Sequence, residues 1–277
     1  MKFSKFIVAV AFSVLSINTF ATNITGEVIM DNYIGAGYNG DVNGDDNKWD
    51  IDKMLVSRDV SGGVTTLEVN IFTSFYDNVG TYGIKLGDLF MAADQNLNNS
   101  GKTPWNPEGT DPYTGDRYTN SNAASTTDTN WNYVYDLSGA RKHTSGTGHL
   151  KSGFGSNQVV TSSSLHNRSR ANQAVMLSDR NTDIVHDSSI WNVLGYSYTS
   201  NNINYGQIKF SFDVSGTDLA TANQIAFRWA MTCANDIIEG LADFSSQNPP
   251  VDVPEPNTII LMLLAMAGLI YRKKVNN

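Results

Sequence analysis

Cysteine, histidine and glutamate are scarce in this chain of 277 residues, which has one cysteine, four histidines and five glutamates. A single cysteine, Cys233, excludes a disulfide within the chain, so stability has to come from a hydrophobic core, turns or a bound metal. The histidines form no zinc-binding spacing such as HExxH, and no GxSxG motif of a serine hydrolase occurs. Scarce glutamate also leaves few candidates for an acid/base pair.

Positive charge is in short supply outside the two ends of the chain. Five of the 19 basic residues lie there, namely Lys2, Lys5, Arg272, Lys273 and Lys274. Without them, 14 basic residues face 27 acidic ones, and the body carries about −13. This balance excludes nucleic acid as a partner, because phosphates need a positive surface, and it suits divalent cations or plain solubility.

Long helical periodicity is missing from residues 22–245, where short runs alternate apolar and polar residues instead. In GQIKFSFDVSG and IAFRWAMTC each run has one apolar face, made by Ile208, Phe210, Phe212 and Val214, and by Ile225, Phe227, Trp229, Met231 and Cys233. We expect the opposite faces, with Arg228 and Thr232 in the second run, to contact water.

A hairpin is predicted from about Trp49, through a turn at Gly62 and Gly63, to a return strand ending near Phe75. GDLFMAA and NWNYVYDL are further short strands. The strand pattern fades over residues 96–130 and 139–169, which we interpret as long polar loops. The predicted fold is all-β, a single antiparallel β-sandwich of the jelly-roll type.

The first 21 residues resemble a cleaved secretory signal, with two lysines, an apolar stretch and a small-residue exit at Ala21. At the other end, a proline-rich linker over residues 246–256 precedes an apolar run that closes on Arg272, Lys273 and Lys274. As a helix that run is about 20 Å long, shorter than the ~30 Å hydrocarbon core. The basic cluster sets its end on the cytoplasmic side.

Pro254, Glu255 and Pro256, the short apolar helix over residues 257–277 and the terminal basic cluster together resemble the PEP-CTERM sorting signal. This resemblance implies processing by an exosortase, a membrane-embedded enzyme of Gram-negative bacteria that make exopolysaccharide. The chain would pass through an inner-membrane intermediate to the cell surface or extracellular matrix. KWDIDKMLVS, YGIKLGDLFMA and IAFRWAMTCANDIIEG are similar to segments of PEP-CTERM proteins of unassigned biochemical role.

The densest acidic stretch, DVNGDDNKWDID, has two interpretations. Asp41, Asn43, Asp45 and Asp52 match part of the ligand spacing of a calcium loop, although Asp46 stands where that loop has glycine. The alternative is a solvated turn whose Asp and Asn side chains cap local backbone groups.

Two further groups are candidates for polysaccharide chemistry. Trp105, Tyr113 and Trp131 lie in or beside polar loops, where aromatic rings could stack on sugars or pack as anchors. Asp236 and Glu239 are the best available carboxylate pair. We therefore expect a non-enzymatic structural, adhesive or exopolysaccharide-associated protein, the alternative being an extracellular polysaccharide hydrolase on a jelly-roll scaffold.

Overall fold

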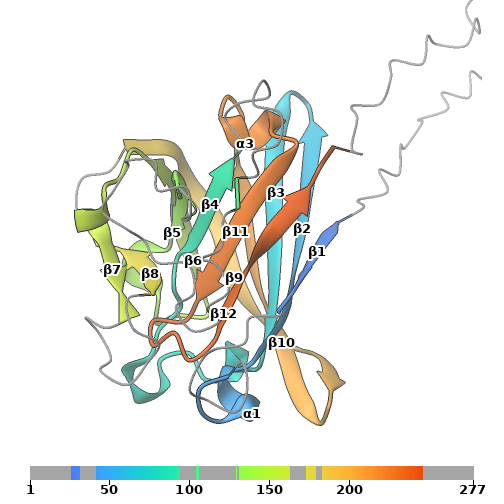
Figure 1. Ribbon diagram of the computed structural model, residues 1–277, viewed down its shortest axis with the longest axis vertical. Coiled ribbons are helices and arrows are strands. Elements are labelled where there is room, and N and C mark those ends of the chain that lie inside the picture. The colour runs from blue at the N-terminus through green and yellow to red at the C-terminus, as the bar shows by residue number, and fades with distance from the viewer. Residues whose placement is uncertain are drawn as a thin grey trace, which may run out of the picture.

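The computed structural model describes residues 26–31, 42–93, 104–105, 129, 131–162, 173–178 and 183–245. The predicted signal segment (1–21), linker (246–256) and sorting signal (257–277) lie outside them. Within the described ranges, no helix combines the length and hydrophobicity needed to cross a bilayer. The described residues form an antiparallel all-β domain, which confirms the predicted all-β class (Figure 1).

In the described part of the chain, ten strands form one sheet in the order β1-β2-β3-β10-β9-β6-β5-β4-β11-β12. Their bounds are β1 Glu27–Met30, β2 Ile51–Ser61, β3 Val64–Thr73, β4 Leu89–Ala93, β5 Tyr133–Asp136, β6 Ser145–Ser152, β9 Asp183–Ser200, β10 Ile203–Asp213, β11 Gln224–Ala230 and β12 Ile237–Asp243. A small second sheet pairs β7 (Val159–Thr161) with β8 (Ala174–Leu177). The helical turns are α1 Asp46–Trp49, η1 Ser74–Asp77, η2 Thr81–Gly83, η3 Ser138–Ala140, η4 Ser156–Gln158 and α3 Asp218–Thr221.

The large sheet curls until its first and last strands meet. β9 forms one corner, because its first half pairs with β6 and its second half with β10. At the opposite seam, Ile29 of β1 packs so closely on Gly240 of β12 that a Cβ there would lie 2.5 Å from the Ile29 Cγ2. The hydrogen-bonded order is continuous, so the molecule has one nearly barrel-like sheet where the sequence predicted a sandwich of two sheets. Its halves form two layers: the first contains β1, β2, β3, β10 and the second half of β9, and the second contains β6, β5, β4, β11 and β12.

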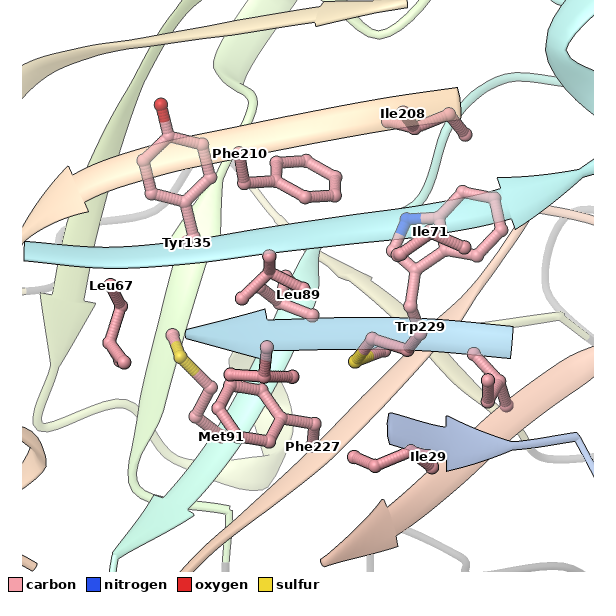
Figure 2. Packing of buried hydrophobic residues seen from close by; sticks show 14 of the residues in the cluster. Ile29, Leu67, Ile71, Leu89, Met91, Tyr135, Ile208, Phe210, Phe227 and Trp229 are labelled. Carbon is pink, nitrogen blue, oxygen red and sulfur yellow. The ribbon is translucent and has the colours of Figure 1, made fainter. Parts of the chain in front are cut away.

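One hydrophobic core fills the interior between the two layers. Ile71 and Phe210 reach it from one layer, and Leu89, Phe227 and Trp229 reach it from the other (Figure 2). The predicted apolar faces of β10 and β11 are confirmed, because every residue named for them is buried. The predicted hairpin is confirmed too, as β2 and β3 with a turn of two positive-φ glycines.

Strand β6 lies where the sequence predicted only loop. Its sequence, SGTGHLKS, has a single large apolar residue, Leu150, in the core. Gly146 and Gly148 let aromatic rings lie close to the backbone of β6, because Cβ atoms there would lie 3.0 Å from Trp191 and 2.7 Å from Tyr135. Neighbouring aromatic rings cover this strand, so it needs no apolar alternation of its own.

The second layer is also covered on its outer side. Ala174 and Leu177 of β8 pack on Phe90 and Val134, and Val175 packs on Ile237. Figure 1 shows β7 and β8 beside the β4–β5 side of the sheet. Arg228 is consequently 0% exposed, and Thr232, which bonds with the backbone of Lys85, is 1% exposed, so the prediction that these side chains contact water is wrong.

Candidate functional site

A buried ion cluster fastens β8 to the second layer. Arg141 donates from Nε and Nη2 to Asp88 at 3.0 and 2.8 Å, and from Nη2 to Asp136 at 2.6 Å. Asp88 also accepts from the backbone N–H of Leu177 in β8 at 2.7 Å, and Lys151 Nζ lies 2.5 Å from Asp136. Burial is the main cause that raises the pKa of Asp88, and the Arg141 charge opposes it. The cluster links distant segments of the fold and therefore has a structural role.

Asp236 and Glu239, the carboxylates considered for hydrolysis, do not face each other. Asp236 accepts from the backbone N–H of Ile51 at 2.6 Å on the core side of the sheet. Glu239 accepts from Arg228 at 2.6 Å, and Arg228 also donates to Gln173 beside β8. Asp236 lies just before β12 and Glu239 lies within it, and each carboxylate binds a group on another segment of the fold.

The outer side of the first layer contrasts with the covered second layer. We call the outward surface of β1, β2, β3, β10 and β9 the open face. Strand register arranges its side chains in rows that run across the strands. One row is Met30, Lys53, Phe72, Gln207 and Leu194; the next is Val28, Leu55, Asn70, Lys209 and Asn192; the third is Ser57, Glu68, Ser211 and Ile190.

Large apolar side chains occupy both margins of the open face. Val28 and Met30 on β1 are 52% and 48% exposed, and Ile190 and Leu194 on β9 are 69% and 39% exposed. Scattered apolar side chains are common on protein surfaces, but these four share one sheet face. The margins are therefore apolar and accessible.

Polar side chains fill the centre of the open face and order one another. Gln207 Nε2 donates to Asn70 Oδ1 at 2.5 Å, and Asn70 Nδ2 donates to Glu68 Oε1 at 3.0 Å. Lys209 Nζ closes the group at 2.7 Å from Glu68 Oε2. Asn70 is buried beneath its neighbours, whereas Gln207, Lys209 and Glu68 remain accessible. The centre thus presents fixed donors and acceptors to a ligand.

An aromatic corner completes one end of the open face. The rings of Phe72 and Tyr198 lie 5.5 Å apart, and Lys53 Nζ lies 4.5 Å from the Tyr198 ring centroid. Tyr198 donates to Asp52, and the buried Tyr205 donates to Asp50. Burial and these carboxylates raise the pKa of both tyrosines, so the hydroxyls stay protonated and the corner stays rigid.

No family model, curated protein or solved structure matches this chain.

The predicted calcium ligands have other partners where the structure describes them. Asp45 caps α1 by accepting from Asn47 N at 3.2 Å, and it pairs with Lys48 at 2.8 Å. Asp52 binds Tyr198 and pairs with Lys53 at 3.2 Å, while Asn43 N donates to Asn235 O at 2.7 Å. Asp41 lies outside the described residues. Among the residues described, no three His, Cys, Asp or Glu side chains gather as a metal site, and Asp45 acts as the capping interpretation predicts.

The aromatic residues proposed for sugar contact are placed differently from one another. Trp131 is 2% exposed and belongs to the cluster under β8, so its ring is not accessible in this structure. Trp105 packs partly buried against the same cluster. Tyr113 lies outside the described residues, as do the sorting motif Pro254, Glu255 and Pro256 and the basic cluster Arg272, Lys273 and Lys274. The accessible aromatic pair, Phe72 and Tyr198, was not identified from the sequence.

Proposed function

We propose that this chain is an exported, non-enzymatic protein of the cell surface or extracellular matrix, with a structural or adhesive role in association with exopolysaccharide. The observation that carries the proposal is the difference between the two sides of the domain. One layer is sealed by β7 and β8, whereas the other leaves apolar margins and a hydrogen-bonded polar centre exposed. A nearly barrel-like domain that presents such a surface suits adhesion.

The resemblance of the C-terminal segment to the PEP-CTERM signal supports the route to that location. In this proposal the signal segment directs export, the apolar run holds the chain in the membrane transiently, and an exosortase processes it near Glu255. Release then delivers the β domain to the surface or matrix.

Binding without turnover is favoured over hydrolysis by the partners of the candidate carboxylates. Asp236 holds the N–H of Ile51, and Glu239 neutralises the fully buried Arg228. A glycosidase needs two carboxyl groups that flank one bond across a cleft. Carboxylates that are each committed to a separate structural partner do not meet that requirement.

Fractionation of the native host tests the proposed location and processing. We expect the protein in the surface or matrix fraction with an intact mass that lacks residues 1–21 and the segment after the P-E-P motif. Replacing Pro254, Glu255 and Pro256 with alanine should retain the protein in the inner membrane, whereas Pro249→Ala with Pro250→Ala, in the same linker, should not. A surface protein that still ends at Asn277 would contradict the sorting route and favour a retained anchor.

A further inference from the structure

We propose that the open face binds an uncharged polysaccharide, whose sugar rings pack on Phe72 and Tyr198 while its hydroxyl groups bond with Gln207, Lys209 and Asn192. This inference rests on the proposed function and names the surface and the ligand class. It concerns a face where none of the sequence-predicted sugar contacts lies.

The charges of the open face exclude a polyanionic ligand. Lys209 pairs with Glu68 at 2.7 Å and Lys53 pairs with Asp52 at 3.2 Å, so each accessible cation already has its own anion. The row beyond Glu68 contains Asp59, Thr66 and Asp213 and adds two carboxylates, of which Asp213 lies 3.7 Å from His186 Nδ1. An acidic polysaccharide would meet like charge there, whereas an uncharged one needs no counter-ion.

The distribution of apolar and polar groups argues for a glycan over a protein partner or a second copy of the chain. Protein interfaces typically have an apolar core, with charged residues displaced to a polar rim. The open face is the reverse, because Met30 and Leu194 lie at its margins while Glu68 and Lys209 lie at its centre. Packing a second protein there would desolvate a charged pair at the centre of the interface.

A sugar chain matches this arrangement because each ring presents C–H groups on its faces and hydroxyl groups around its edge. Phe72 and Tyr198 offer half-buried aromatic rings held 5.5 Å apart, and the hydrogen bond to Asn70 fixes the amide of Gln207. Side chains that are ordered before binding lose little conformational entropy when the ligand arrives. The rows cross five strands spaced about 4.8 Å apart, so the surface extends about 19 Å and suits a polymer.

Affinity measurements on the mature chain test this assignment. The probes are an uncharged glucan, an uncharged galactomannan, an anionic polygalacturonate and the matrix polysaccharide isolated from the native host. We expect binding to at least one uncharged polymer with a dissociation constant that does not change between low and high salt, and no binding to polygalacturonate.

Variants of the open face identify the surface. Phe72→Ala and Gln207→Ala should each weaken binding about tenfold, the effect of losing one good contact. Tyr82→Ala is the matched control, because Tyr82 is 76% exposed but lies in η2, which is not one of the five strands of the open face. Leu194→Glu replaces an exposed apolar side chain of the open face with a charged one. It tests the surface independently if Phe72→Ala does not fold.

The outcomes separate this inference from the proposed function. Unaltered binding of uncharged glycan or matrix polysaccharide in all three face variants would overturn the assignment of the surface, while matrix association would stand. Salt-sensitive binding to polygalacturonate alone, or a dimer dissociated by Leu194→Glu without any glycan bound, would also overturn it. Absence of the protein from the surface and matrix fractions would instead contradict the proposed function.

Discussion

Replacing Arg141 with methionine should destabilise the domain strongly, because two buried carboxylates depend on its guanidinium group. Arg141 bonds to both oxygens of Asp88 and to Asp136. Asp88 is 0% exposed, and in the variant it is left with the backbone N–H groups of Leu137 and Leu177. Removing one partner from a buried ion pair costs about 3–5 kcal/mol, because the buried carboxyl group loses the cation that compensates its charge.

For a domain of this size that loss corresponds to a decrease in Tm of roughly 6–20 °C. The decrease should depend on pH. Burial raises the pKa of Asp88, and removing Arg141 removes the charge that opposes this. Above about pH 4 the folded variant then holds a proton that the unfolded chain releases, so its stability falls as pH rises. The deficit should be smaller near pH 5 than at pH 7.

Thermal unfolding followed by circular dichroism at both pH values measures the effect. Lys48→Met is the matched control, because it removes one positive charge from an exposed pair, with Lys48 Nζ 2.8 Å from Asp45. We expect no resolvable change in Tm for this control. If Arg141→Met unfolds within about 2 °C of Lys48→Met at pH 7, the cluster does not fasten the layers as described.

Three other experiments test separate parts of the structure. Gly87→Ala should destabilise the fold by about 3 kcal/mol or more, because its Cβ would lie 2.0 and 2.6 Å from carbonyl oxygens of β11 and β8. Gly195→Ala is the control: its Cβ would meet nothing within 4 Å, so chemical denaturation should show no change in stability. Burial raises the pKa of Cys233 to about 12, so a thiol reagent at about pH 8 should label it only after unfolding, and labelling of the folded protein would contradict its burial. Adding or chelating calcium should leave the Tm unchanged, because Asp45 and Asp52 already have lysine partners. A rise in Tm with calcium that is lost in the double variant Asp45→Ala, Asp52→Ala would restore the calcium interpretation.

Alternation of apolar residues predicted the best-defined strands, because side chains on a pleated strand point to opposite sides in turn. In β10, Ile208 and Phe210 lie in the core as expected, while Gln207 and Lys209 point outward. The turn between β2 and β3 was predicted from the adjacent glycines Gly62 and Gly63, which have positive φ in the structure. These features depend on neighbours in sequence.

Features that depend on distant neighbours were not predictable in the same way. The period of β11 placed Arg228 on the face opposite the core, but nothing in that period indicated that β8 would cover it. The strand character of β6 depends on rings contributed by Tyr135 and Trp191. Likewise, Phe72 and Leu194 join one row only through the register of three strands, β3, β10 and β9, so the open face could not be assembled from the sequence.

Footprinting tests the open face most directly. Hydroxyl-radical labelling of the mature chain, with and without the isolated matrix polysaccharide, reports the accessibility of individual side chains. The polysaccharide should protect Met30, Leu194 and Tyr198 and leave Tyr82 and Val60, exposed elsewhere at 76% and 67%, unchanged. Protection of Tyr82 or Val60 with the open face still labelled, or no protection at all from a polysaccharide that binds, would contradict the account.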